Sequence, residues 1–159
     1  MTLEPRAFVL DNARGEDTIR EALGQAYTVT QEHGTAGSGA RRRTWLDTFD
    51  WRLYRAGLVL EHEQTRRGGQ LILTGTDGAP LAEQPVTGLQ PSRLPAGPVA
   101  DSIGALISPR ALLPAARAVS TRSVFRLLNA DGKTVARVLA DRTVMGGTEL
   151  DLRVQVSEP

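Results

Sequence analysis

The chain has 159 residues, close to the usual size of one domain, and 40% of them are hydrophobic, which is enough for one core. The formal net charge is +1, so bulk charge attracts neither nucleic acid nor a membrane surface. The absence of cysteine excludes disulfides, thiolate catalysis and cysteine-based zinc sites.

The N-terminal sequence lacks the basic start and long apolar run of a signal peptide, and no stretch approaches the ~20 apolar residues of a membrane helix. We therefore expect a soluble, cytoplasmic protein with no nucleic-acid or membrane partner. Lys133 is the only lysine, so nearly every cationic group is an arginine. Arginine is a forked donor suited to phosphate or carboxylate, and a GC-rich genome is an equally compatible reason for its abundance.

The N-terminal third predicts a strand, a short helix and a second strand. Leu3–Leu10 is apolar enough for a strand, interrupted by Pro5. Glu16–Tyr27 has helical spacing, with Ile19 and Leu23 on one face. Tyr27–Gln31 is rich in residues that favour strands.

The middle of the chain alternates short strands with turns. Asp50–Ala56 predicts a helical turn stopped by Gly57, and Gly68-Gly69 and Asp77-Gly78 predict tight turns. Strands are predicted over Arg42–Thr48, Leu58–Thr65, Gln70–Thr74 and Pro80–Val86. Leu89–Pro98 is proline-rich, and we interpret it as a linker between two sub-halves of one domain, since neither half could bury a core alone.

The last third predicts a helix and three strands. Val99–Ile107 favours a helix. Val119–Leu128 and Thr134–Thr143 flank an Asp-Gly turn and predict a hairpin. Thr148–Val156 alternates polar and apolar residues without a break, and this alternation places four polar side chains on one face: Glu149, Asp151, Arg153 and Gln155.

These elements predict one α+β domain over 1–159, with about eight antiparallel strands and two or three short helices. Charged residues recur on single strand faces. On an open sheet these faces would be solvated, whereas in a closed barrel they would line a polar interior, and the sequence leaves both arrangements open.

One segment carries a specific resemblance. Arg41–Glu63 resembles the signature of the CYTH, or triphosphate-tunnel, family at six positions: Trp45, Asp47, Thr48, Leu53, Gly57 and Leu60. Gly69–Thr74, Pro114–Leu127 and Gly132–Val144 resemble later strands of that family. The resemblance implies an antiparallel eight-stranded β-barrel or tunnel, in which acidic side chains bind Mg²⁺ or Mn²⁺ and basic ones hold a triphosphate.

The sequence departs from the family pattern at the acidic and basic positions that the family uses to bind metal and phosphate. The acidic and basic positions of the first strand align with Leu3, Pro5 and Ala7. An Arg-x-Arg pair is replaced by Glu61 and Glu63, which reverses the sign of both charges. Further departures are Thr74, Val119, Thr121 and Arg137. So altered, a tunnel is expected to repel a triphosphate.

A remnant of the site remains in sequence. Six arginines are candidate phosphate ligands: Arg43, Arg117, Arg122, Arg126, Arg142 and Arg153. Asp141, Glu149 and Asp151 are candidate ligands for Mg²⁺ or Mn²⁺, and Asp141 and Glu149 are also the weak catalytic candidates.

Three functions stay open. The first is a degenerate, non-catalytic CYTH-like module that binds or scaffolds and associates with polyphosphate. Proteins it resembles often carry a CHAD domain next, so the chain is expected to be the N-terminal part of a CYTH–CHAD protein. The second is a metal-dependent triphosphatase acting on an inorganic or organic triphosphate. The third is a pure protein-interaction domain.

Overall fold

The computed structural model describes residues 6–9, 16–33 and 39–159, and two compact units can be distinguished in the chain. The first unit contains Met1–Ala40 and Val119–Pro159, and the second contains Arg41–Ala118. Each unit has its own cluster of buried apolar side chains. Whether 1–159 behaves as one cooperative domain stays a prediction.

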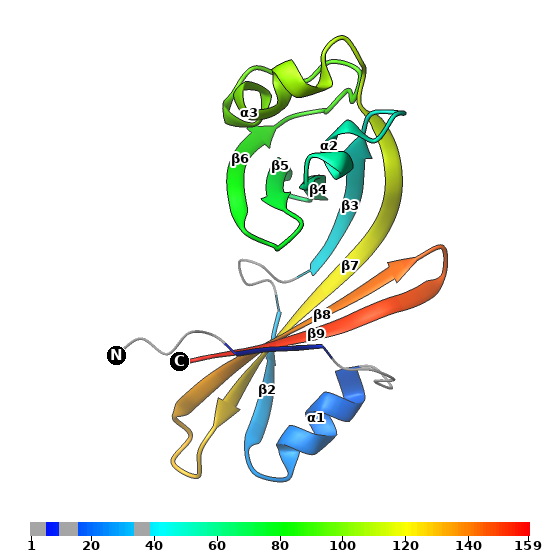
Figure 1. Cartoon of the computed structure of the whole chain (residues 1–159). Helices are drawn as coiled ribbons and strands as arrows, with labels where there is room; N and C mark the ends of the chain where they lie inside the picture. Colours follow the sequence, from blue (N-terminus) through cyan, green and yellow to red (C-terminus); the bar gives the residue numbers. More distant parts are fainter. Residues whose placement is uncertain (1–5, 10–15, 34–38) are drawn as a thin grey trace. The chain divides into compact units, whose positions relative to one another are not determined.

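The described residues form an antiparallel sheet and three helices (Figure 1). The strands are β1 (Arg6–Val9), β2 (Thr28–Glu32), β3 (Gly39–Asp47), β4 (Leu58–Thr65), β5 (Gly68–Gly75), β6 (Pro80–Val86), β7 (Leu113–Leu128), β8 (Thr134–Met145) and β9 (Thr148–Ser157). The helices are α1 (Glu16–Gly24), α2 (Arg52–Arg55) and α3 (Pro98–Ile107). Eight strands follow the order β1-β9-β8-β7-β3-β4-β5-β6, and β2 pairs with β7 beside this path. The predicted antiparallel α+β fold is therefore confirmed.

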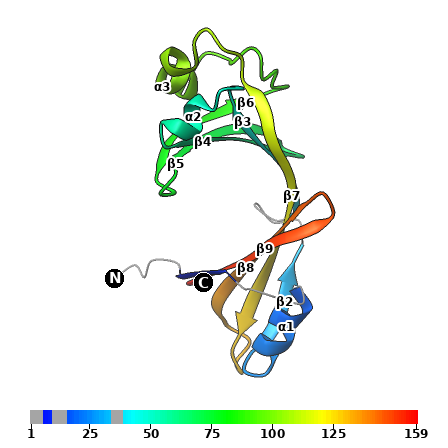
Figure 2. The same cartoon turned by 45° about the vertical axis from the view of Figure 1, so that its right-hand side comes forward.

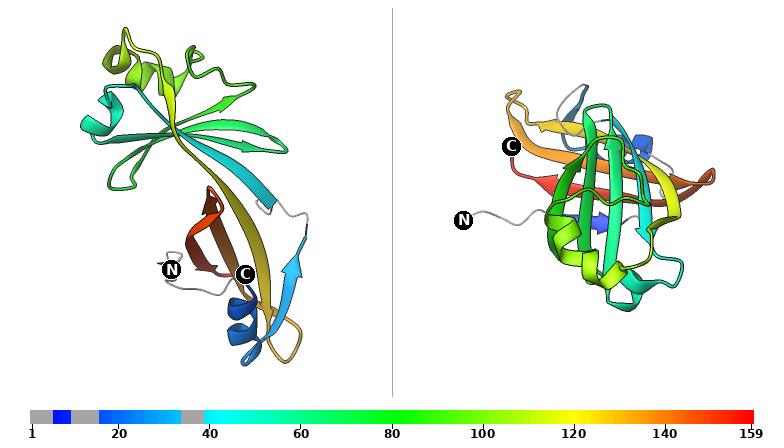
Figure 3. Two further views of the ribbon diagram at one scale, coloured as in Figure 1. Left: turned by 90° about the vertical axis from the view of Figure 1, so that its right-hand side faces the viewer. Right: turned by 90° about the horizontal axis from the view of Figure 1, so that it is seen from above.

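In the second unit, β3 to β6 form a sheet with α2 and α3 on one face (Figure 2). Alternation in β4 directs Leu60 toward the helices, and the same side of β5 carries Leu71 and Leu73. Helix α3 buries Val99 and Ile103 against them, at helical spacing. The opposite face of this sheet carries Arg43, Glu61 and Glu63, together with Trp45 and Ile72. The right-hand view of Figure 3, from above, shows these strands side by side with α3 across one end.

The residues that carry the CYTH resemblance stabilise the turn between β3 and β4. The buried carboxylate of Asp47 accepts hydrogen bonds from the backbone N–H groups of Thr48 (2.7 Å), Leu53 (2.9 Å) and Tyr54 (3.0 Å). Leu53 is 1% exposed and belongs to the core. Gly57 has φ 72°, a left-handed conformation that suits glycine and ends α2. The signature therefore specifies local structure.

The proline-rich segment after β6 is tied to the sheet by Gln84. Its amide donates to the carbonyls of Pro95 (3.1 Å) and Ala96 (3.0 Å) and accepts from the N–H of Val99 (3.2 Å), at the start of α3. Gln84 is 5% exposed, so all three bonds are shielded from water. The predicted linker is thus a loop anchored within one unit.

In the first unit, α1 packs on the strands β2, β7, β8 and β9 (Figure 1). Ile19 contacts a cluster that includes Phe125, which is fully buried, and Leu152. The hairpin between β7 and β8 turns at Asn129–Lys133, where the Asn129 side chain accepts the N–H groups of Asp131 and Lys133, both at 3.0 Å. The predicted Asp-Gly hairpin is confirmed.

One prediction about strand faces is wrong. The ladder pairs Thr143 with Asp151 but Val144 with Glu149, so the register shifts by one residue in β9. Residues opposite each other share a face, and Thr143 and Val144 point to opposite sides. Glu149 therefore lies on the face opposite Asp151 and Arg153, because the extra residue of the bulge interrupts the alternation.

Several element bounds also differ from the sequence predictions. Helix α1 ends at Gly24 and β7 begins at Leu113. The turn predicted at Gly68-Gly69 lies at 66–67, and Gly68 already belongs to β5. Of the first predicted strand, Leu3 and Pro5 lie outside the described residues, while Ala7 is paired with Gln155 in β9. None of the helices in the part of the chain described is long and apolar enough to cross a membrane.

Candidate functional site

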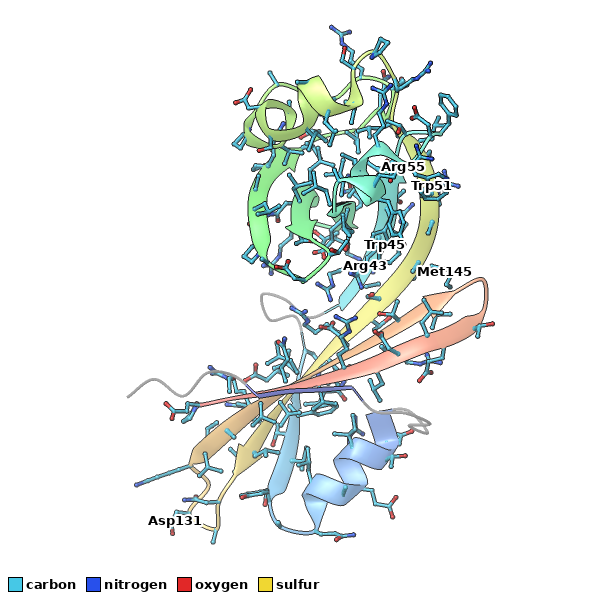
Figure 4. The ribbon with its side chains drawn as sticks, in the orientation of Figure 1. Arg43, Trp45, Trp51, Arg55, Asp131 and Met145 are labelled. Carbon is cyan, nitrogen blue, oxygen red and sulfur yellow. The ribbon has the colours of Figure 1, made fainter. Side chains whose placement is uncertain are left out.

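The charged face of the second unit is built on β3 and β4. Arg43 holds Glu61 through two hydrogen bonds, from Nε to Oε1 at 2.6 Å and from Nη2 to Oε2 at 2.7 Å. The Arg43 guanidinium also lies 4.8 Å from the centroid of the Trp45 ring, on the same strand face (Figure 4). The side chains of Arg43 and Glu61 are only 24% and 12% exposed, so this ion pair is largely shielded from solvent.

A second ion pair extends this face. Arg41 Nη1 lies 3.1 Å from Glu63 Oε2, with side-chain exposures of 17% and 19%. Glu61 and Glu63 occupy the positions where the CYTH resemblance implies arginines. Each carboxylate therefore neutralises an arginine of β3. The net charge of Arg41, Arg43, Glu61 and Glu63 together is zero.

The charged face of the first unit is centred on Arg122 and Asp141, which stand opposite each other in the ladder of β7 and β8. Arg122 Nε lies 2.9 Å from both carboxylate oxygens of Asp141, and Arg122 Nη2 also donates to Oδ2. Asp151 and Arg153 follow on β9, with Arg153 Nε 2.9 Å from Asp151 Oδ2.

Two arginines on this face share one carboxylate. Arg126 and Arg137 are directly opposite in the ladder, and their Nε atoms lie 3.0 Å and 3.8 Å from Glu32 Oε1. The Arg126 Nε atom is buried and makes no hydrogen bond, despite its distance from Glu32. Like charges directly opposite on a sheet repel. Two guanidinium groups therefore lie near a single carboxylate here.

Two of the three predicted metal ligands, Asp141 and Asp151, share a face of neighbouring strands, and Glu149 does not. Asp141 is held by Arg122, and Glu149 lies on the other face, paired with Arg142 at 2.6 Å. Asp151 keeps one buried oxygen, Oδ1, without a hydrogen bond. Within the described ranges no group of three or more histidine, cysteine, aspartate or glutamate side chains could hold a metal ion.

The six predicted phosphate ligands differ in what they contact. Arg43 and Arg117 belong to the second unit, and the other four belong to the first. Five of the six are paired with a carboxylate, and their partners are, in chain order, Glu61, Asp141, Glu32, Glu149 and Asp151. Arg117 is exposed, and among the residues of known placement it has no ion-pair partner. The assignment of phosphate and metal ligands stays a prediction.

The sequence reasoning missed three members of these pairs: Glu32, Arg41 and Arg137. Arg137 could have been placed opposite Arg126 by counting outward from the Asp-Gly turn, were it not for the register shift between Leu127 and Leu128. The partners of Glu32 and Arg41 lie in strands distant in sequence, so no local signal identifies them.

His62 lies opposite the core residue Leu71, on the helix-facing side of β4, and is partly buried. Its Nε2 atom is buried and makes no hydrogen bond, and it lies beside Gly69, where an added Cβ would come within 2.9 Å of it. Burial lowers the pKa of His62 below its ordinary value of 6.5, because desolvation disfavours the charged imidazolium. The neutral His62 ring therefore packs against this sheet, beside Gly69.

Comparison with known proteins bears on the fold. A candidate adenylate cyclase from Bacillus halodurans is 16% identical, with a TM-score of 0.64 over 96% of this chain and 78% of its own. A candidate adenylyl cyclase from Hippeastrum, described as having a dominant triphosphatase activity, is 14% identical, with a TM-score of 0.61 over 96% and 77%. The chain has a CYTH-like fold. A third CYTH-like structure, a candidate adenylate cyclase from Vibrio parahaemolyticus, is 10% identical, with a TM-score of 0.54 over 100% and 78%.

No protein-family model matches the sequence of this CYTH-like domain, and no curated protein matches it. At identities of 10–16%, the likeness to the three solved structures concerns the fold, and function must be argued from the residues of this chain.

Proposed function

We propose that this CYTH-like domain binds phosphate chains without hydrolysing them and acts as a binding or scaffolding module. The observation that carries the proposal is the pairing of Glu61 with Arg43 and of Glu63 with Arg41. A triphosphate carries about four negative charges, and its desolvation is offset by several unpaired cations and a divalent ion. The two glutamates remove that surplus from the second unit.

Arg126 and Arg137 supply the anion-binding part of the proposal. They face each other, they share Glu32, and the buried N–H at Arg126 Nε lacks a hydrogen bond. A phosphate bound between the two guanidinium groups would offset the repulsion between them. Polyphosphate is the ligand that the CYTH–CHAD resemblance suggests. A downstream CHAD domain and a cytoplasmic location belong to this proposal.

Release of phosphate from tripolyphosphate with Mg²⁺ or Mn²⁺ tests the proposal directly. We expect no turnover above background. A kcat of about 1 s⁻¹ or more, an ordinary enzymatic rate, refutes a non-catalytic module. Calorimetric titration with polyphosphate separates the module from a pure interaction domain, because phosphate binding gives salt-sensitive heat and a pure interaction domain gives none.

The alternative is a metal-dependent triphosphatase, which the triphosphatase activity of the Hippeastrum neighbour favours. It requires Mg²⁺ or Mn²⁺ held by Asp141, Glu149 and Asp151. These residues fit such an ion poorly, because Asp141 is occupied by Arg122 and Glu149 lies on the opposite face. The alternative predicts that Asp141→Ala, Glu149→Ala and Arg122→Ala abolish hydrolysis. Wild-type rates in all three variants reject it.

A further inference from the structure

Aromatic side chains gather on the surface of the turn that precedes and forms α2. Aromatic residues are only 4% of the chain, yet Phe49, Trp51 and Tyr54 lie within one short segment. They are 62%, 50% and 68% exposed, so none of them is used for the core of the second unit. Large exposed aromatic side chains in one place are a feature of interaction surfaces.

Trp51 adopts a backbone conformation that is unfavourable for it. Its φ and ψ are 57° and 45°, in the left-handed region that favours glycine. The backbone N–H of Arg55 donates to the carbonyl of Trp51 at 3.0 Å, so the two residues lie one helical turn apart, at the start and the end of α2. A strained residue whose side chain does not pack in the core points to a role outside the fold.

Positive charge surrounds the aromatic residues. The Arg110 guanidinium lies 4.8 Å from the centroid of the Phe49 ring and its Nε is 3.7 Å from Asp50. Arg52 also binds Asp50, at 3.1 Å, and donates to the carbonyl of Ser108 at 2.7 Å. Arg55 is exposed, and among the residues whose placement is described it has no ion-pair partner.

Asp50 is paired with two of these three arginines, Arg52 and Arg110. A hydrogen bond with the Thr48 side chain, followed by contacts with Arg52, lowers the pKa of Asp50 and keeps it ionised. Two positive charges therefore remain around the three aromatic rings. An acidic ligand complements this surplus.

We propose that Phe49, Trp51, Tyr54, Arg55 and Arg110 form a docking surface for an acidic segment of a partner protein that also carries apolar side chains. The rings supply rigid apolar contacts, and the two arginines supply donors for carboxylates. This surface shares no residue with the proposed phosphate site at Arg126 and Arg137. Protein is favoured over single-stranded nucleic acid, because the Phe49 ring is already stacked with Arg110 and only two surplus charges are present, too few to follow a phosphate backbone.

Selection of peptides from a random dodecapeptide library displayed on phage, with the whole chain as bait, tests the surface. Peptides retained by the wild type are counter-selected on Trp51→Gly, which removes the ring and suits the left-handed backbone, so the variant is expected to fold. Arg55→Glu reverses one surplus charge. Tyr27→Ala removes an aromatic side chain that is 43% exposed in the first unit and serves as the matched control.

We expect the enriched peptides to combine acidic and apolar residues. In fluorescence anisotropy their affinity should fall about tenfold or more for Trp51→Gly and Arg55→Glu and stay unchanged for Tyr27→Ala. Failure to enrich any consensus, a basic consensus, or equal binding to Trp51→Gly overturns the proposal. Tighter binding of oligothymidylate than of the peptides, or self-association that Trp51→Gly abolishes, assigns the surface to another occupant and overturns it as well.

Discussion

Arg43 of β3 and Glu61 of β4 form a bidentate ion pair, with nitrogen–oxygen distances of 2.6 Å and 2.7 Å. The carboxylate stands where the CYTH resemblance implies an arginine. The pair is largely shielded from solvent, so its geometry is fixed and an incoming phosphate must displace a well-placed competitor. A glutamate in place of an arginine at this position therefore does more than change the net charge. Glu61 also occupies the hydrogen-bond donors of Arg43.

Restoring positive charge at this face should restore triphosphate binding. We predict that the double variant Glu61→Arg/Glu63→Arg binds tripolyphosphate about tenfold more tightly than the wild type in calorimetry at low salt, because the face changes by four charges. Glu61→Gln/Glu63→Gln is the matched control: it frees Arg41 and Arg43 without adding cations, and a smaller gain is expected. Unchanged affinity in both variants, with circular dichroism like that of the wild type, contradicts a role for this face in anion binding.

The pair Arg126 and Arg137 predicts a different response on the first unit. Removing Glu32, the carboxylate that they share, should strengthen polyphosphate binding severalfold in the Glu32→Gln variant, whereas Arg137→Gln should weaken it. Arg153→Gln, on the same face but paired with Asp151 on its own strand, is expected to have little effect. Equal losses for Arg137→Gln and Arg153→Gln would indicate attraction by net charge alone, without a defined site.

Local sequence was sufficient for much of this fold. The predicted bounds of Leu58–Thr65 and Pro80–Val86 coincide with β4 and β6, since turn residues, glycine above all, flank both strands. The signature around Asp47 predicted a turn, and the three hydrogen bonds of the carboxylate explain why these residue types are needed there.

The charged faces could be predicted only in part, because they depend on register. Alternation placed Glu61 and Glu63 together, but nothing local pairs them with Arg43 and Arg41. The bulge in β9 moved Glu149 to the other face, and a bulge leaves no clear sequence signal where the pattern of polar and apolar residues is unbroken.

Asp47 should be important for stability and neutral in binding. In Asp47→Ala three backbone N–H groups lose their acceptor in a buried turn, and we expect a loss of about 2–4 kcal/mol in the free energy of unfolding. Asp47→Asn keeps one acceptor oxygen and should lose less. Urea denaturation measures both. An Asp47→Ala variant as stable as the wild type would show that the turn is held by the packing of Leu53 instead.

His62 predicts how stability depends on pH. Its folded pKa lies below 6.5, so between the folded pKa and about 6.5 the unfolded chain binds the proton that the folded chain does not. Stability should therefore rise with pH through this window and become constant above about pH 7.5.

We predict that His62→Leu loses this dependence and is at least as stable at neutral pH, because it removes a buried nitrogen without a hydrogen bond. His33→Gln replaces the other histidine, which is exposed, and serves as the matched control. The measurement is the urea midpoint at pH 5.5 and 7.5, and a midpoint for His62→Leu that falls as steeply on acidification as that of the wild type would assign the dependence to another group.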